Sequence, residues 1–198
     1  YTGKTVYARF KQKQHTVLFG VHSSGHGSLT AKNGNTSISS NSKVNYGSTI
    51  VFTATPSTGY QIEGWYSNSA CDIAINNGTN DTYTVTITGG TNVYVKFVAQ
   101  QYTITYKDQN NANFSGTHAS GYPTTHTYGT ATTLKTASKT GYNFEGWYKE
   151  SACTNKVTSL GATAYTANIT LYAKWTANTY AITLNANYTG GTNGSATA

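Results

Sequence analysis

Carboxylates, the usual source of general acid and base catalysis, are scarce in this 198-residue chain. Glycoside hydrolysis needs two of them facing one cleft. Glu63 and Glu145 stand at matching positions of two similar sequence blocks, which predicts that they lie in separate modules. Spacing supports no Ser-His-Asp or Cys-His set, and the histidines do not recur between the blocks. We therefore expect a non-enzymatic protein. The six carboxylates are Glu63, Asp72, Asp81, Asp108, Glu145 and Glu150.

Two short stretches have metal-ligating residue types but too few of them. His22 and His26 are four residues apart, and no third ligand of the kind that zinc requires stands nearby. The stretch 108–111 (Asp-Gln-Asn-Asn) offers oxygen atoms, but calcium sites generally use several carboxylates and this one has a single Asp108. No metal and no cofactor are expected.

Two Trp-Tyr pairs, Trp65-Tyr66 and Trp147-Tyr148, are the candidate ligand contacts. An exposed pair would form a platform for sugar rings. In a small module with few other large side chains, the indole is instead expected in the core. The core interpretation is favoured, and the platform remains the alternative.

Cys71 and Cys153 occupy the same position after each Trp-Tyr pair. Equivalent sites in tandem modules lie about a module length apart, whereas a disulfide requires Cα atoms within about 7 Å. The two residues are therefore not expected to pair with each other. Two free thiols, or two disulfides to absent partners, stay open.

The elements that must position these residues recur along the chain. The block 59–66 (Gly-Tyr-Gln-Ile-Glu-Gly-Trp-Tyr) returns at 141–148 (Gly-Tyr-Asn-Phe-Glu-Gly-Trp-Tyr). Three alternating segments, 6–10, 93–97 and 171–175, each read as a closing strand, and each is followed by an opening strand. This recurrence predicts two whole repeats, 14–99 and 100–176, with the end of a preceding repeat at 1–13 and the start of a following one at 177–198. We expect a segment of a longer array.

These residues resemble a known family. An opening strand, Tyr128-Gly129, the block 141–148 and the closing segment Leu-Tyr-Ala-Lys-Trp at 171–175 are similar to the internalin B-type, or Listeria-Bacteroides, repeat of bacterial surface proteins. Residues 14–99, with Tyr46-Gly47 and the block 59–66, resemble its divergent branch. The resemblance implies small, mainly β, β-grasp-like modules in an elongated array with little or no helix. It implies a helix within 151–163, where this composition allows only a short, irregular one, and it supplies no site residues.

Composition favours the same architecture. Twenty Gly, two Pro and many Thr and aromatic residues are typical of a β-rich chain. In the first repeat, Ile50, Phe52 and Ala54 alternate on one face of an expected strand, whereas 28–48 reads as polar and turn-rich. Charged residues make up only 10%, against roughly 25% in ordinary soluble domains.

The charge pattern bears on partners and location. The net charge is +7, but the basic residues are spread out apart from Arg9, Lys11 and Lys13, so nucleic-acid binding is not expected. No apolar run is long enough to span a membrane. We expect an extracellular, secreted or surface-attached stalk in adhesion or surface display, whose partners are other repeats. The alternatives are binding of a cell-wall polymer, glycan or host protein, or self-association into fibres or layers.

Overall fold

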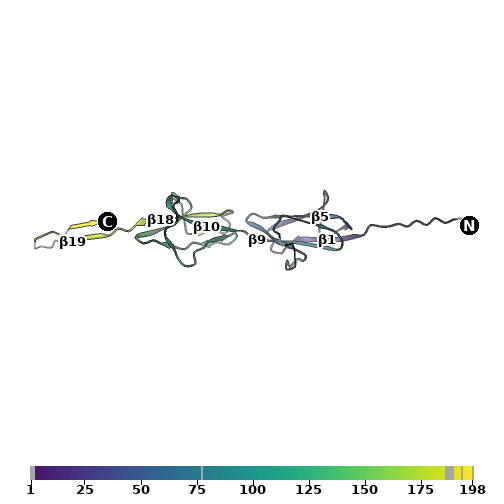
Figure 1. Ribbon diagram of the computed structural model, residues 1–198, viewed down its shortest axis with the longest axis horizontal. Helices are drawn as coiled ribbons and strands as arrows, with labels where there is room; N and C mark the ends of the chain where they lie inside the picture. Colours follow the sequence, from purple (N-terminus) through teal and green to yellow (C-terminus); the bar gives the residue numbers. More distant parts are fainter. Residues whose placement is uncertain (1–2, 77, 186–189, 193, 198) are drawn as a thin grey trace. The chain divides into compact units, whose positions relative to one another are not determined.

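The computed structural model describes residues 3–76, 78–185, 190–192 and 194–197. The chain divides into two units, Tyr1–Gln100 (unit 1) and Gln101–Ala198 (unit 2), both built of strands (Figure 1). Among the described residues, the single helical segment is the short 3-10 turn η1 (Gln109–Asn111). The mainly β organisation in small tandem modules, predicted from the sequence, is confirmed.

Unit 1 consists of two sheets. Each sheet is given in the order of its hydrogen-bonded neighbours. The first is β4 (Ser42–Asn45), β1 (Gln14–Val21), β9 (Thr91–Ala99), β6 (Tyr60–Tyr66) and β7 (Ala74–Asn76). The second is β3 (Thr36–Ile38), β2 (Gly27–Asn33), β5 (Thr49–Pro56) and β8 (Thr82–Thr86).

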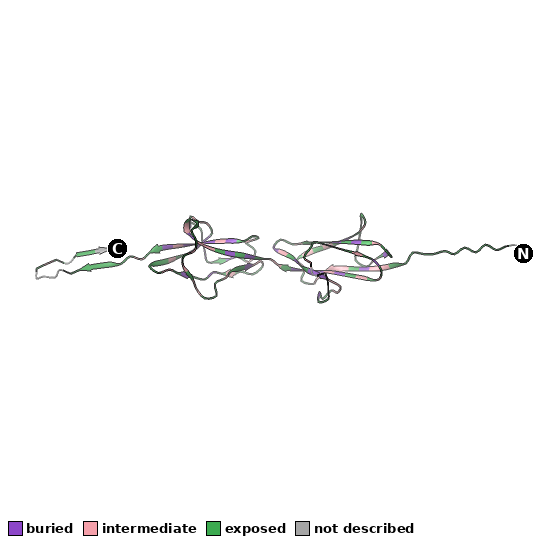
Figure 2. Ribbon diagram, viewed as in Figure 1, coloured by how far each residue is buried: buried purple, intermediate pink, exposed green. Residues whose placement is uncertain are grey.

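The core of unit 1 lies between these two sheets (Figure 2). Along β5, Ile50, Phe52 and Ala54 are buried while the residues between them are exposed, as the period of two in the sequence predicts. From the facing sheet, Phe19 of β1 meets Phe52 edge to face, with ring centroids 5.5 Å apart. Alternation on both sheets therefore produces one shared apolar layer.

Unit 2 repeats the five-stranded sheet but covers it with less regular structure. The sheet is β12 (Thr125–Thr127), β10 (Gln101–Asp108), β18 (Ile169–Ala177), β15 (Tyr142–Tyr148) and β16 (Lys156–Val157). Two short pairs replace the second sheet: β11 (Thr117–His118) with β14 (Ala137–Ser138), and β13 (Thr132–Thr133) with β17 (Ser159–Leu160).

Stacked rings and one buried carboxylate anchor the long segment after β10. His118 stacks on Phe114 and on Tyr122, with centroids 4.2 and 3.9 Å away. Asp108 accepts hydrogen bonds from the Trp175 indole at 2.8 Å and from the Ser115 hydroxyl at 2.5 Å. Because both carboxylate oxygens are used in this way, Asp108 fastens the segment to the closing strand.

In each five-stranded sheet, the strands that come first and last along the chain are parallel neighbours. β1 pairs with β9 over Val17–Val21 and Thr91–Val95, and β10 pairs with β18 over Ile104–Asp108 and Ile169–Ala173. All other strand pairs in these two five-stranded sheets are antiparallel. The closing strands predicted at 93–97 and 171–175 thus lie inside their sheets, and their alternate residues are buried.

Two sequence expectations about local structure are wrong. Residues 28–48 contain strands β2, β3 and β4, because Leu29, Ala31 and Val44 face the core while polar residues face outward. Residues 151–163 contain no helix. Val157 pairs with Trp147 and Leu160 with Thr132, and extended backbone lets both apolar side chains reach the core.

The ends of the chain differ from the complete repeats. Residues 3–13 form no strand, although 6–10 was expected to be one, and Val6 and Phe10 are fully exposed. A closing strand is an interior strand, and no described strand pairs with this segment. β19 (Ala181–Leu184), whose residues are exposed, pairs antiparallel with β20 (Gly194–Thr197). Residues 1–2, 186–189, 193 and 198 of the two predicted end pieces lie outside the described residues.

Candidate functional site

Both Trp-Tyr pairs lie on the strand next to the closing strand, with the indole pointing inward. Trp65 is 0% exposed and Trp147 is 3% exposed. The Trp65 indole N–H donates to the carbonyl of Asn80 at 3.0 Å, and the Trp147 indole N–H donates to the carbonyl of Lys135 at 2.6 Å. The two tryptophans are therefore core residues with satisfied indole donors.

A β-bulge before each pair determines this orientation. The register of β6 against β9 shifts between Ile62 and Gly64, and that of β15 against β18 shifts between Phe144 and Gly146. One extra residue reverses which face the following side chains occupy. Ile62 and Trp65 consequently both face the core although they are three residues apart, which simple alternation from the sequence does not predict.

The tyrosine of each pair lies opposite another tyrosine of the closing strand. Tyr66 is level with Tyr94, and Tyr148 is level with Tyr172. In unit 1, Glu63 accepts a hydrogen bond from the Lys96 ammonium at 3.1 Å and one from the Tyr66 hydroxyl at 3.4 Å. Partial burial, and then the Glu63 charge, raise the pKa of Tyr66.

Unit 2 builds the corresponding surface differently. The Lys174 ammonium lies 5.7 Å from the centre of the Tyr148 ring, a cation–π contact across two strands. Ligand contact through Trp65, Tyr66, Trp147 and Tyr148 stays a prediction. Both indoles and the Tyr148 side chain are buried, so Tyr66 is the only one of these four side chains that is partly accessible to a ligand.

Cys71 and Cys153 lie at equivalent turns after the Trp-Tyr strands. Both have a φ of 52°, and their backbone N–H groups donate to the carbonyls of Asn68 and Glu150. Both thiols are free and buried, and burial raises the pKa of each. A protonated, covered thiol is a poor nucleophile. This environment also disfavours a disulfide to an outside partner.

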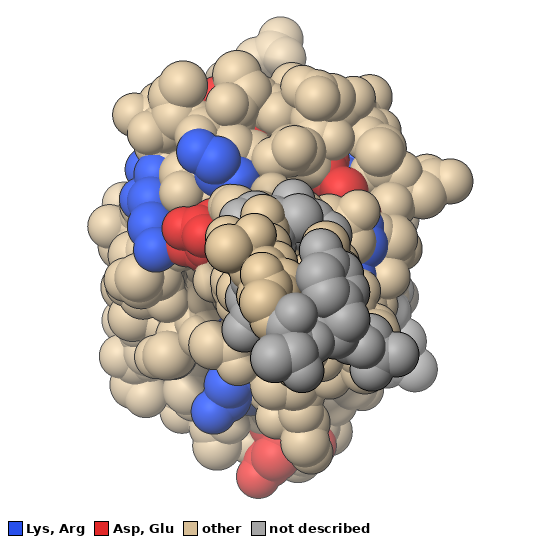
Figure 3. Space-filling view, turned by 90° about the vertical axis from the view of Figure 1, so that its left-hand side faces the viewer, with Lys and Arg blue, Asp and Glu red and all other residues tan. Residues whose placement is uncertain are grey.

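The remaining candidates for chemistry do not come together. In the described parts of the chain, no three His, Cys, Asp or Glu side chains are grouped as a metal site would require. Glu63 and Glu145 fall in different units, as the repeat predicts. On the face drawn in Figure 3, uncharged atoms predominate, and the few basic groups lie apart or beside acidic ones.

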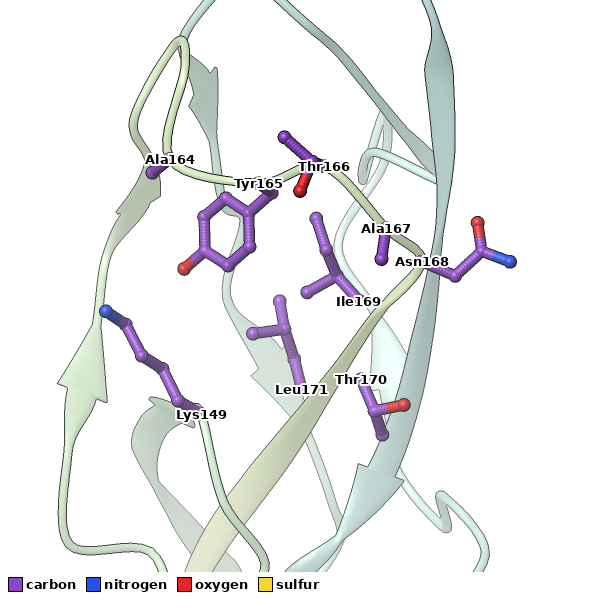
Figure 4. A pocket seen from close by; sticks show the side chains of 9 residues that line it. All are labelled: Lys149, Ala164, Tyr165, Thr166, Ala167, Asn168, Ile169, Thr170 and Leu171. Carbon is purple, nitrogen blue, oxygen red and sulfur yellow. The ribbon is translucent and has the colours of Figure 1, made fainter. Parts of the chain in front are cut away.

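A hollow of about 290 Å³ in unit 2 brings together two polar groups that the sequence analysis did not single out (Figure 4). Lys149 follows β15 directly, and Tyr165 belongs to the loop that leads into β18. Their side chains extend toward each other in Figure 4, and Ile169 and Leu171 line the apolar side of the hollow. Only tertiary structure brings these positions together, so no sequence signal could have identified the pair.

The Lys149 ammonium and the Tyr165 hydroxyl are both available to a ligand. Within the described residues, neither the Lys149 ammonium nor the Tyr165 hydroxyl has a hydrogen-bond or ion-pair partner. His126, which is fully buried, meets the Tyr165 ring edge to face at 5.8 Å. The hollow thus offers a cation, a hydroxyl, one ring and an apolar wall.

A second hollow of about 250 Å³ lies beside the bulge of unit 2. It is lined by the apolar residues Leu134, Phe144, Trp147 and Val157 and by the charged residues Lys135, Glu145 and Lys156. These charges are of mixed sign, so this hollow has no evident preference for one class of ligand.

These features define a class of protein: small all-β modules repeated along a chain, each built on a mixed sheet whose first and last strands run parallel. Residues 102–174 match the family described as Listeria-Bacteroides repeat domain, and residues 21–101 match the divergent InlB B-repeat domain. The chain therefore belongs to the internalin B-type repeats of bacterial surface proteins, and unit 1 to their divergent branch.

Two curated relatives come from Evansella cellulosilytica. One, named "Putative membrane protein", is 26% identical over 89% of this chain and 23% of its own length. The other, named "Putative Gly-rich membrane protein", is 24% identical over 92% of this chain and 18% of its own length. The chain thus spans about a fifth of the length of these relatives. No solved structure matches it with comparable significance. No helix in the described residues is long and apolar enough to cross a membrane.

Proposed function

We propose that this chain is a non-catalytic spacer in an extracellular bacterial surface or secreted protein, where it projects another domain away from its point of attachment. Membership in a repeat family of surface proteins supports the setting. The described carboxylates, histidines and thiols form no reactive set, which is consistent with a mechanical role.

The observation that carries this proposal is the parallel pairing of the first and last strands. Because β1 and β9 run side by side in the same direction, the chain enters unit 1 at one end of the sheet and leaves it at the other. Val17 and Thr91 are paired, so they lie at the same height along the sheet. The chain enters at Gln14, three residues before this height, and leaves at Ala99, eight residues beyond it. These eleven steps span about 36 Å at ~3.3 Å per residue. Unit 2 has the same offset, from Gln101 to Ala177.

The connection between the units is short. β9 ends at Ala99 and β10 begins at Gln101, so Gln100 alone separates them. The Gln100 N–H donates to the Gly59 carbonyl of unit 1. A one-residue connection contributes little length of its own, so the length of the proposed spacer comes from the units.

Small-angle X-ray scattering tests the proposal. We expect the maximum dimension to grow by about 36 Å or more for every additional copy of residues 101–176 inserted in tandem, because each copy adds one entry-to-exit span. A maximum dimension that stays nearly constant as copies are added would show that the units fold back on one another, and would contradict the spacer.

A second candidate function is binding of an acidic saccharide in the Lys149–Tyr165 hollow. The Lys149 ammonium suits a carboxylate, and the Tyr165 ring with Ile169 and Leu171 suits the apolar face of one sugar ring. In unit 1, Ser67 stands where unit 2 has Lys149, directly after Trp-Tyr. Unit 1 is thus an internal control that lacks the cation.

NMR titration with oligogalacturonate tests this site. We expect shifts of the Ile169 and Leu171 methyl signals, and at least a tenfold loss of affinity in Lys149→Ser, which introduces the residue of unit 1. Lys32→Ser removes an exposed charge from unit 1 and should leave the affinity unchanged. If Lys149→Ser and Lys32→Ser lost the same affinity, or if polyglycerol phosphate bound as well as oligogalacturonate, the binding would reflect charge alone and this site would be contradicted.

Binding of a host protein and self-association have less support. A host protein could contact the exposed tyrosine edges, and nothing in the described chain selects such a partner. Self-association through the edges of the five-stranded sheets is disfavoured by their short edge strands, which have two to four residues. Short edges offer few unpaired backbone groups to a neighbouring chain.

A further inference from the structure

We propose that the parallel first and last strands of each five-stranded sheet form a shear clamp, which allows the array to bear tension without unfolding. The inference rests on the proposed spacer function, because tension reaches a unit through its two connections to the rest of the protein. The clamp consists of β1 with β9 in unit 1 and of β10 with β18 in unit 2.

The direction of load follows from the strand order. Tension pulls β1 at Gln14 and β9 at Ala99, which lie at opposite ends of the parallel pair. The two strands are therefore pulled along their lengths in opposite directions. The backbone bonds of a parallel ladder are evenly spaced. The bonds of the five aligned residue pairs thus share the load, whereas a hairpin pulled at its open end loses its bonds one after another.

The ladder of unit 1 is buried on its inner face and partly covered on its outer face, where Leu18 is 38% exposed. On the inner face, Val17, Val93 and Val95 are 0% exposed. On the outer face, the Tyr94 ring lies over Gly20, where an added Cβ would be 3.4 Å from the ring. Water cannot readily replace a backbone bond in such a place, so a ruptured pair loses most of its hydrogen-bond energy.

Neighbouring strands restrain both members of the clamp. β1 lies between β4 and β9, and β9 lies between β1 and β6. β10 and β18 have the same flanks in β12 and β15. For one clamp strand to slide past the other, at least one of them must also leave its second partner. The clamp strands are thus among the most restrained strands of each sheet.

The clamp also protects everything between its two strands. Residues 22–90 and 109–168 connect the clamp strands, and they stay folded while the ladders hold. The buried thiols of Cys71 and Cys153, and the Lys149–Tyr165 hollow except for the part formed by β18, belong to these segments. A unit under tension therefore keeps these features in their folded arrangement.

Single-molecule stretching of the chain tests the clamp. Pulled from its two ends, the chain should show two separate rupture events at high force. Gln14–Ala99 comprises 86 residues and Gln101–Ala177 comprises 77. At ~3.5 Å per residue, less the folded span, rupture should release about 260 Å from unit 1 and about 230 Å from unit 2. This difference identifies each unit in the trace.

A second pulling direction provides the matched control. With Cys71 and Cys153 changed to Ser, thiol handles at Gln14→Cys and Ala99→Cys load unit 1 in shear. Handles at Gln14→Cys and Gly89→Cys pull on the same end of the two strands, because Gly89 lies just before Thr91, and an added Cβ there meets open space. We expect a several-fold lower rupture force in this second geometry.

Equal rupture forces in the two geometries would overturn the clamp, even if scattering shows that the array is extended. A compact array in scattering would instead contradict the spacer, whatever the forces. The clamp and the spacer can therefore be contradicted independently of each other.

Discussion

At the residue scale, unit 2 places a histidine and a threonine at two positions that unit 1 fills with aliphatic side chains. Counting from the shared Tyr-Gly, His126 and Thr132 correspond to Val44 and Ile50. His126 is fully buried, and its Nδ1 lies 2.8 Å from the Thr132 hydroxyl. Burial lowers the pKa of His126, and a hydrogen bond with the backbone of Ala162 partly opposes this. Unit 2 thus has a core position that resists protonation.

The first prediction concerns acid sensitivity. Because the folded-state pKa of His126 lies below its unfolded value of about 6.5, this position opposes folding increasingly as pH falls through 6.5 toward the folded pKa. The urea midpoint of unit 2 should therefore fall between pH 7.5 and 5. In His126→Val/Thr132→Ile, which introduces the pair of unit 1, the fall should be smaller.

Two other titratable groups of unit 2 affect how the pH dependence of its urea midpoint is interpreted. The pKa of His118 is also lowered by burial, so the double variant should keep part of the pH dependence. Glu150 titrates outside the range, because hydrogen bonds from Thr154 and Asn155 lower its pKa to about 2. A double variant with the full pH dependence of the parent would exclude His126 as its source.

At the scale of elements, the bulge in the Trp-Tyr strand decides what that strand buries. The two bulges are at equivalent positions but differ in backbone conformation. Gly146 has a φ of 133°, which side chains other than glycine rarely adopt, whereas Gly64 is not among the residues with positive φ. The Lys156 side chain also lies over Gly146. Gly64 and Gly146 therefore allow the effect of positive φ to be compared at equivalent positions of the two units.

The second prediction compares these glycines. Gly146→Ala should lower the free energy of unfolding of unit 2 by about 1–3 kcal/mol, because alanine is strained at this φ and its Cβ displaces Lys156. Gly64→Ala should cost less, since its Cβ would meet only the Tyr66 side chain, with the hydroxyl nearest at 3.2 Å. Urea unfolding of both variants measures the difference. Equal losses would mean that the positive φ does not determine the cost.

At the scale of the whole molecule, each unit has its own core. Every member of the two buried clusters belongs to one unit or the other: Val17 to Phe97 in unit 1, and Ile104 to Trp175 in unit 2. Trp65 reports on the first core, and Trp147 and Trp175 report on the second. Separate cores favour units that unfold one at a time.

The third prediction tests that independence. Leu171→Ala, at a fully buried position, should destabilise unit 2 by about 2–5 kcal/mol. In a thermal series, the indole N–H signal of Trp147 should disappear at a lower temperature, while the Trp65 signal keeps its midpoint. The converse variant is Val93→Ala at the equivalent position of unit 1. A shift of both indole signals in either variant would show that the units unfold together.

Patterns within short stretches of sequence predicted much of the fold. The recurrence of the Gly-Trp-Tyr block indicated tandem β modules, and alternation in 93–97, 171–175 and 50–54 identified buried strand faces correctly. The core interpretation of Trp65 agrees with its burial. These inferences succeed because the pleat of a strand imposes a period of two on its own side chains, whatever its neighbours are.

Further features depended on the tertiary structure. Strands β2–β4 were missed because they hold only one or two apolar residues each, too few to show a period of two. The bulges are visible only as a shift in pairing between the Trp-Tyr strand and the closing strand. The sequence of one strand does not show which residues of another strand it pairs with. The parallel pairing joins residues about 65–75 positions apart, and Lys149 and Tyr165 meet only after β15 and β18 pair. Local sequence thus determined which segments repeat and where the strongly alternating strands lie. Long-range pairing decided register, strand direction and what the loops bring together, because these depend on contacts between distant parts of the chain.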